Sequence, residues 1–298
     1  MKGKMQTSKE IFIPQTYDEY LRAVHSALVD AGVEMHQRTK KCGKFATKEG
    51  GGQRGYTRQR RDCNSVWSCP ICRERIIDKY REKYNQICWD HLSHGGRTLL
   101  ITFNPHRDKG KKESLVNQYQ RFSNSMRYLR EREPWKEKLK SKLGHVKNYR
   151  RNEISFSEGP SYHIHSHVVY LCENHSVSTD EIENDLHELW NEACRKNGFG
   201  WSKKGVGVNV REGENVGIYG LKKEHSLEDF ENVKKMLDEL KKRTARKFLK
   251  KDSYSIGDLE RNIFSIKNGI YSNIFDLDET NDLLSAYNET FYGKKYLV

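Results

Sequence analysis

The stretch YHIHSHVVYL, residues 162–171, contains three histidines that alternate with other residues and then run into a β-branched and aromatic segment. Alternate side chains of a β-strand point to the same face, so a strand here places His163, His165 and His167 together on one face. Two imidazoles at positions i and i+2 are close enough to bind one cation. The pattern predicts a strand that carries a metal site; the alternative is a set of histidines with a structural role only.

A third ligand is expected from the neighbouring strand. Residues 152–156 and 161–171 both have strand patterns, and a turn at residues 158–160 (Glu-Gly-Pro) joins them into a hairpin. Glu153 is then the natural donor. A set of two histidines and a carboxylate leaves coordination positions open for water and a substrate oxygen, which a catalytic metal requires. We therefore expect two of the three histidines, together with Glu153, to hold one divalent metal.

The rest of the chain alternates between helical and strand patterns. Apolar residues at helical spacing predict helices over residues 17–29, 73–91, 113–132, 179–196 and 226–250. Further strands are predicted over residues 98–103 and 205–210, and the basic segment between the first two helices is expected to be a loop or a hairpin. Strands interleaved with helices, some joined by hairpin turns, indicate an α+β fold.

The cysteines form a spaced group near the N-terminus. Cys69-Pro-Ile-Cys72 is a compact knuckle, with Cys63 and Cys42 upstream, and four thiolates suit a tetrahedral structural Zn²⁺. His36 could replace Cys42 as the fourth ligand. The alternative to a zinc site is that the four cysteines are unrelated buried thiols. The other cysteines lie on apolar faces and are expected in the core: Cys88, Cys172 and Cys194.

Charge and composition narrow the class of partner. The chain has 298 residues, 35% of them hydrophobic, and 54 Lys and Arg against 41 Asp and Glu give a net charge of +13. Such a balance favours polyanionic partners, with nucleic acid first. The longest uninterrupted apolar run, residues 168–172, is far below the roughly 20 residues needed to cross a bilayer. The first twenty residues contain no apolar signal segment, so we expect a cytoplasmic protein without a membrane partner.

One segment concentrates this positive charge. Residues 38–62 contain nine Lys and Arg against two acids, with a break at Gly50-Gly51-Gly52. Four arginines precede the cysteine knuckle: Arg54, Arg58, Arg60 and Arg61. They predict a contact with DNA that weakens as the salt concentration rises. The alternative is that they form an ordinary solvated surface.

The residues of the first stretch, YHIHSHVVY, resemble the histidine motif of HUH endonucleases. The form His-x-His-x-His after a Gly-containing turn resembles the rolling-circle replication initiators of small plasmids within that superfamily. The resemblance implies a central antiparallel sheet with flanking helices, and a divalent metal, usually Mg²⁺ or Mn²⁺, held by His165 and His167. His163 matches an additional histidine of that branch. The spacing from Cys42 to Cys72 resembles the N-terminal cysteine module of the same initiators, with one more residue between Cys63 and Cys69 than expected.

The resemblance also implies a nucleophilic tyrosine in a Tyr-x-x-Lys pattern downstream. The segment VGIYGLKKEHS, residues 216–226, supplies Tyr219 and Lys222 about fifty residues after the histidines. Some members carry an acid one turn before the tyrosine. Here that position is Asn215, and Glu214 lies one residue earlier, so the termination step stays open. Three tyrosines are alternative second nucleophiles without a positive argument: Tyr162, Tyr170 and Tyr254.

The expected function is that of an enzyme that nicks and joins one DNA strand at a plasmid or phage origin through a 5′-phosphotyrosine. Its DNA partner would be a single-stranded or hairpin nick site. No Gly-x-x-x-x-Gly-Lys-Ser/Thr motif occurs, so a host helicase would unwind the duplex, and a homodimer is left open. The expected divisions are a zinc module at 1–95, a nickase core at 96–225 and a helical region at 226–298. The alternatives are a transposase or relaxase of the same chemistry, and a zinc-containing DNA-binding regulator without catalysis.

Overall fold

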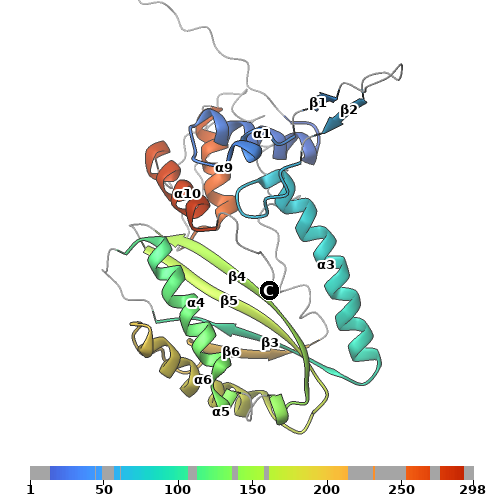
Figure 1. Ribbon diagram of the computed structural model, residues 1–298, viewed down its shortest axis with the longest axis vertical. Helices are drawn as coiled ribbons and strands as arrows, with labels where there is room; N and C mark the ends of the chain where they lie inside the picture. The colour runs from blue at the N-terminus through green and yellow to red at the C-terminus, as the bar shows by residue number, and fades with distance from the viewer. Residues whose placement is uncertain are drawn as a thin grey trace, which may run out of the picture.

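A computed structural model gives the fold of the chain as α+β, built around a four-stranded antiparallel sheet (Figure 1). The structure describes residues 14–43, 45–48, 57–60, 62–106, 113–135, 140–157, 161–213, 231, 253–268 and 276–291. The sheet has the strand order β4-β5-β3-β6. Its strands are β3 (Arg97–Phe103), β4 (His145–Ser157), β5 (Ser161–Cys172) and β6 (Val208–Glu212).

The histidine stretch lies in β5, in the interior of the sheet, as predicted. On one side β5 pairs with β4, from Ser157 opposite Ser161 to His145 opposite Cys172. On the other side it pairs with β3, from Phe103 opposite Ser166 to Arg97 opposite Cys172. β5 therefore has a partner on both sides from Ser166 to Cys172, while its first residues, including His163 and His165, pair with β4 alone. The predicted turn at residues 158–160 lies outside the described residues.

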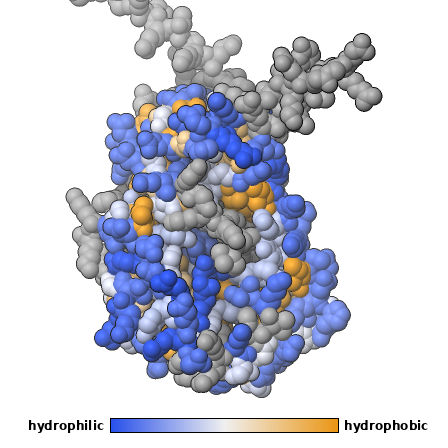
Figure 2. Space-filling model, in the orientation of Figure 1, coloured by the Kyte–Doolittle hydropathy of each residue, from blue (hydrophilic) through white to orange (hydrophobic). Residues whose placement is uncertain are grey.

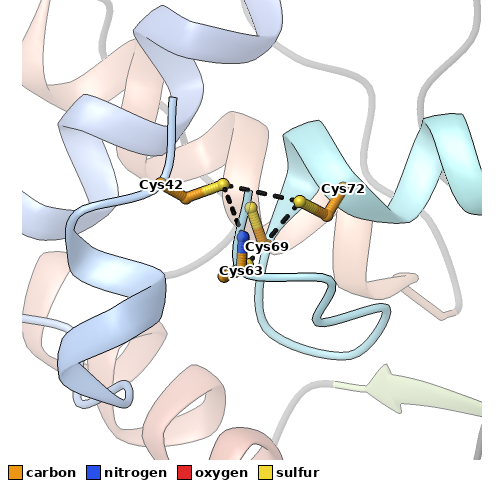
Figure 3. Close-up of side chains that lie close together, drawn as sticks. All are labelled: Cys42, Cys63, Cys69 and Cys72. Atoms are coloured by element: carbon orange, nitrogen blue, oxygen red, sulfur yellow. Dashed lines mark hydrogen bonds between the residues drawn. The ribbon is translucent and has the colours of Figure 1, made fainter. Parts of the chain in front are cut away.

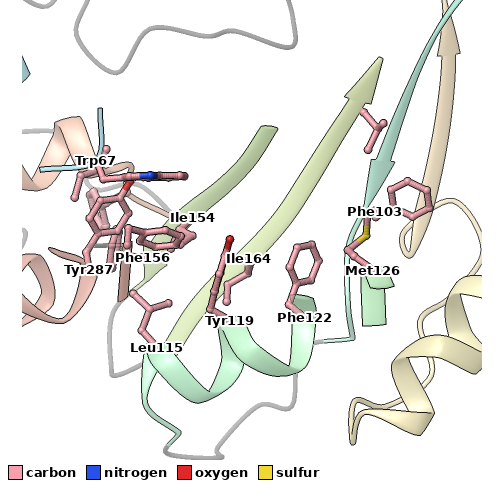
Figure 4. Close-up of a cluster of buried hydrophobic side chains, with 14 of the residues drawn as sticks. Trp67, Phe103, Leu115, Tyr119, Phe122, Met126, Ile154, Phe156, Ile164 and Tyr287 are labelled. Atoms are coloured by element: carbon pink, nitrogen blue, oxygen red, sulfur yellow. The ribbon is translucent and has the colours of Figure 1, made fainter. Parts of the chain in front are cut away.

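One face of the sheet packs against two helices, α4 (Leu115–Glu131) and α6 (Thr179–Lys196). Phe122 and Met126 on α4 project toward the strands, with Met126 beside Phe103 of β3 (Figure 4), and all three side chains are buried. Trp190 on α6 packs its ring 5.3 Å from the ring of Phe103 and 5.9 Å from that of Phe122. The short helix α5 (Glu133–Trp135) lies beside them and places Trp135 against Tyr170. The side chains of β5 that point to this face, such as Ile164, Val168 and Tyr170, are buried and apolar.

The long helix α3 (Pro70–Ser93) packs against one end of the opposite face. Cys88 on α3 joins a buried cluster with Leu100, Val169 and Leu171 of the sheet. The histidines are on this same face of β5 but at its other end, because His163, His165 and His167 alternate in step with Val169 and Leu171.

N-terminal and C-terminal segments pack together at the start of α3. The helices α1 (Tyr17–Asp30), α9 (Ile256–Lys267) and α10 (Leu277–Phe291) surround it, and α3 runs from this group to the sheet (Figure 1). Trp67, just before α3, stacks on Phe291 with ring centroids 4.3 Å apart. Arg73 on α3 forms a buried ion pair with Glu260 on α9. The segment between α1 and α3 contains α2 (Gln37–Lys40) and a hairpin of β1 (Phe45–Lys48) and β2 (Thr57–Arg60), one of the two forms expected for it.

Polar residues cover most of the visible surface. Figure 2 shows a largely hydrophilic face with small, separate hydrophobic patches. Among the described residues, no helix combines the length and the apolar character that a bilayer crossing demands. The predicted helix over residues 226–250 and the predicted domain boundary near residue 225 fall outside the described residues, apart from Glu231.

Candidate metal centres

The first candidate centre is a group of two histidines and a carboxylate, all partly buried, on one face of the sheet. The strand register places Glu153 directly opposite His165, while His167 lies two residues further along β5, on the same face. The Oε2 atom of Glu153 is 3.3 Å from Nε2 of His165 and 3.2 Å from Nε2 of His167. One ligand atom from each of the three residues lies within 4.8 Å of the other two, so the group could hold one metal ion.

A threonine on the next strand orients one of these rings. Thr102 on β3 pairs with His167 in the register, and its Oγ1 lies 3.0 Å from Nδ1 of His167. In the metal-free group, Nε2–H of His167 donates to the ionised Glu153, and Nδ1 accepts from the Thr102 hydroxyl. If Nε2 binds a metal instead, Nδ1 carries the proton and donates to Thr102. Hydrogen bonds of this kind fix the tautomer and the orientation of metal-binding histidines. Sequence reasoning missed Thr102; its one signal is a polar residue in the apolar strand LLITF.

The electrostatics of the group favour an ionised carboxylate. Burial by itself would raise the pKa of Glu153, but hydrogen bonds with His165 and His167 and the nearby charge of Arg151 outweigh it. The net effect holds the pKa of Glu153 well below its usual range. Arg151 is buried, lies opposite His167 on the same face, and was also missed by sequence reasoning. The centre therefore combines an anionic oxygen, two imidazoles and an adjacent guanidinium.

One buried atom in the group has no protein partner among the described residues. Nδ1 of His165 is shielded from solvent and makes no hydrogen bond there. The donor set of imidazole nitrogens with a carboxylate oxygen suits a divalent cation. His163 lies next to the group, opposite Ser155, with its ring centroid 5.2 Å from that of His165, but it does not belong to the close set of ligand atoms.

The second candidate centre is formed by the four cysteines of the predicted zinc module. Their sulfur atoms converge from the turn after α2, the segment before α3 and the first turn of α3 (Figure 3). Sγ of Cys72 is 3.4 Å from Sγ of Cys42 and 3.6 Å from Sγ of Cys63. Sulfurs around a tetrahedral zinc with bonds of about 2.3 Å are about 3.8 Å apart. The group could therefore bind a metal such as zinc, and Cys42 is the fourth member, as expected.

Local structure prepares one of these sulfurs, Sγ of Cys42, to carry negative charge. The backbone N–H of Cys63 donates to Sγ of Cys42 at 3.5 Å, and that of Ser65 donates to Sγ of Cys63 at 3.4 Å. Hydrogen bonds from the other thiols, that of Cys63 first, hold the pKa of Cys42 far below its ordinary value. Metal ligation requires thiolates, and donors to sulfur stabilise them.

His36 takes another role. Its Nδ1 accepts a hydrogen bond from the backbone N–H of Arg38 at the start of α2. Among the described residues, the group of four sulfurs includes Cys42 and not His36, so His36 does not replace Cys42 as the fourth ligand.

Several predicted site residues are not placed by the structure. Tyr219, Lys222 and Glu214 lie outside the described residues, as do Arg54 and Arg61. Arg58 and Arg60 lie on β2, which follows the zinc module's first cysteine in the chain.

Two of the alternative nucleophiles are core residues. Tyr170 and Tyr254 are buried, and burial raises the pKa of Tyr170 far above its ordinary value, which makes its phenolate inaccessible. Tyr162 is half-buried, with its ring 5.9 Å from that of Phe156.

Comparison of the chain with protein-family profiles, with curated proteins and with solved structures found no match.

Proposed function

We propose that this protein is a metal-dependent DNA nicking and joining enzyme of the HUH type that initiates rolling-circle replication at a plasmid or phage origin. The observation that carries the proposal is the group of His165, His167 and Glu153 on the face of an antiparallel sheet. A sheet with helices packed on its opposite face agrees with the HUH fold that the histidine motif implies.

Each residue of the group has a distinct part in the proposed site. His165 and His167 would supply neutral nitrogen ligands, and Glu153 would supply an anionic oxygen that is already ionised. A bound Mg²⁺ or Mn²⁺ would polarise the scissile phosphate and stabilise the charge that develops on its oxygens. Thr102 would hold the ring of His167 in its ligating orientation.

Tyr219 is the proposed nucleophile. A phenol has a pKa of about 10 and attacks poorly unless the phosphate is activated. Its oxygen would form a bond to phosphorus while the bond from phosphorus to the 3′ oxygen breaks, and the phenol proton leaves as the 3′ oxygen gains one. The products are a 5′-phosphotyrosine and a free 3′-hydroxyl that can prime synthesis. Lys222 would position the phosphate, and Glu214 is the candidate acid for termination.

The cysteine group is proposed to hold a structural Zn²⁺ that shapes the N-terminal module. Four arginines between Cys42 and Cys63 in the sequence would then contact origin DNA: Arg54, Arg58, Arg60 and Arg61. Each neutralised phosphate releases counterions, so this contact would weaken steeply as salt rises.

A labelled single-stranded origin oligonucleotide, incubated with the protein and Mn²⁺, tests the proposal. We expect a covalent protein–DNA adduct that requires added Mn²⁺ and is lost in Tyr219→Phe. An oligonucleotide that is bound but stays whole would favour the non-catalytic regulator. A transposase or relaxase would share the adduct and differ only in the DNA that it selects.

A second variant separates chemistry from folding. The double change His165→Ala and His167→Ala should abolish nicking while duplex binding stays within about twofold of the wild type. An equal loss of nicking and of duplex binding would assign these histidines to folding.

A further inference from the structure

The loop between α6 and β6, residues 199–207, presents large apolar side chains to solvent. Trp201 is 53% exposed and Val206 is 59% exposed. Among the described residues, the other exposed large hydrophobic side chains are Trp89 and Val116, which lie on separate helices. Single exposed apolar side chains are common on protein surfaces, so a binding role for Trp201 has to be argued from its support and its neighbours.

Buried hydrogen bonds hold this loop in one conformation. Ser202, next to Trp201, is 2% exposed, and its backbone N–H donates to Oδ1 of Asn191 at 2.8 Å. The carbonyl oxygen of Ser202 accepts from Nδ2 of Asn191 and lies 3.0 Å from Nε2 of His187. The ring of His187 also meets the indole of Trp201 edge to face. The tryptophan is therefore exposed on a rigid support, which lowers the entropic cost of binding.

The loop is attached to the strand that carries Thr102. Asn104 follows β3 and donates from its backbone to the carbonyl oxygen of Gly207 at 2.8 Å, and from Nδ2 to that of Val206 at 2.9 Å. In the sheet, Asn209 pairs with Thr102, and Thr102 pairs with His167. Strand spacing places Asn209 about 10 Å across the sheet from His167. The loop meets β6 at the same end of the sheet as the histidines, because Thr102 pairs with both Asn209 and His167. Trp201 rests against His187 of α6, on the face opposite the histidines, so a single strand that reached both sites would pass over the edge strand β6.

Positive charge lies close to the exposed indole in the sequence. Lys203 and Lys204 are exposed and come two and three residues after Trp201. Residues 193–211 contain five Lys and Arg and no Asp or Glu. An aromatic platform next to cations is the usual means by which proteins hold single-stranded nucleic acid, since bases stack on the ring and the cations contact the backbone.

We propose that Trp201, with Lys203 and Lys204, forms a base-stacking platform for the single-stranded DNA that enters the histidine centre. We call these three residues the Trp201 platform. The inference rests on the proposed function, because the DNA strand is its expected occupant. It adds a binding element that neither the histidine motif nor the cysteine module contains.

Fluorescence anisotropy with a labelled oligothymidylate of about 16 nucleotides tests the platform in the full-length protein, without added divalent metal. We expect Trp201→Ala to weaken binding about 10-fold and Trp201→Phe, which keeps an aromatic ring, to weaken it less than about threefold. Trp89→Ala is the matched control, because Trp89 is 57% exposed on α3; it should bind within about twofold of the wild type. Equal affinities of Trp201→Ala and Trp89→Ala would overturn the proposal.

The lysines give an independent test that leaves the indole in place. In the double variant Lys203→Gln and Lys204→Gln, the slope of log affinity against log salt should fall by about 1.4, at roughly 0.7 for each single-strand phosphate that a lysine no longer neutralises. An unchanged slope would remove the lysines from the platform. A platform that captured a protein instead of DNA would leave oligothymidylate binding unchanged in every variant, which overturns the proposal.

Failure of the platform and failure of the proposed enzyme give different results. If the wild type nicks the origin oligonucleotide but Trp201→Ala binds and nicks normally, the platform alone is wrong. If the wild type binds single strands through Trp201 but forms no adduct with Mn²⁺, the platform stands and the nicking function falls.

Discussion

At the scale of single residues, Thr102 gives the sharpest expectation, because it contacts His167 without being a ligand. Replacing Thr102 by Val keeps the β-branched shape of the strand residue but removes the oxygen that bonds Nδ1. We expect Mn²⁺ affinity, measured by titration calorimetry, to fall about 10- to 100-fold, the usual range for loss of a partner that orients a metal ligand.

A second variant and a spectroscopic measurement test whether Thr102 acts by orienting the ring of His167. Thr102→Ser retains the hydroxyl and should restore most of the affinity. Nitrogen chemical shifts of His167 in the metal-free protein should show the proton on Nε2, which donates to Glu153, and a hydrogen-bonded Nδ1 in the wild type and in Thr102→Ser. In Thr102→Val the Nδ1 shift should move to that of a nitrogen without a hydrogen bond. The same Nδ1 shift in all three proteins would show that Thr102 does not orient the ring.

The candidate site was only partly visible in the sequence. His165, His167 and Glu153 could be predicted because a two-residue period and a hairpin turn are local patterns. Thr102 and Arg151 could not, because their roles depend on which strands flank β5 and in what register. The part assigned to Tyr219 stays a prediction, since it rests on a short motif in a segment outside the described residues.

At the scale of elements, the ion pair between Arg73 and Glu260 joins α3 to α9. Both side chains are 2% exposed, and both carboxylate oxygens accept hydrogen bonds from the guanidinium. Arg73→Ala would leave the Glu260 carboxylate buried beside a cavity. We expect the free energy of unfolding, measured in urea, to fall by about 3–5 kcal/mol.

The matched control is an arginine in an exposed ion pair. Arg22 and Asp18 pair on the surface of α1, with side chains 37% and 52% exposed. Arg22→Ala should lower the free energy of unfolding by about 0.5 kcal/mol or less, because water screens the pair. Similar losses in Arg73→Ala and Arg22→Ala would mean that the contact between α3 and α9 contributes little to stability.

Most elements could be predicted where periodicity was strong. The predicted helix over residues 179–196 coincides with α6, and the strand over 98–103 lies within β3. The sequence patterns did not predict the first half of β4. Residues 145–151 contain three Lys and Arg, and a bulge lies between His145 and Lys147, so polar and apolar residues do not alternate there. They form a strand because β5 continues beside them through Cys172, a pairing between segments that no local pattern reveals.

At the scale of the whole molecule, the cysteine group lies where the N-terminal and C-terminal helices meet the start of α3. A metal there would stabilise the packing of α1, α9 and α10 together. We expect one zinc per chain by elemental analysis of the purified protein. Removal of that zinc by a chelator should lower the midpoint of thermal unfolding, because metal binding and folding are coupled at such sites.

Substitution of two buried cysteines, one inside and one outside the sulfur group, distinguishes a metal site from ordinary core thiols. Cys69→Ser should reduce the zinc content well below one per chain, because Cys69 belongs to the sulfur group. Cys88→Ser should leave the zinc content at one, because Cys88 packs among apolar side chains on α3. Equal zinc contents in both variants would contradict a tetrahedral site formed by the four cysteines.

The proposed reaction requires a cation site on the sheet that works with a tyrosine from a later segment of the chain. The most direct measurement is mass spectrometry of the peptides released after the protein reacts with a single-stranded origin oligonucleotide and Mn²⁺. We expect a nucleotide mass attached to the peptide that contains Tyr219, and no such mass when His165 and His167 are both alanine. Attachment to another residue, or an adduct that persists without those two histidines, would contradict it.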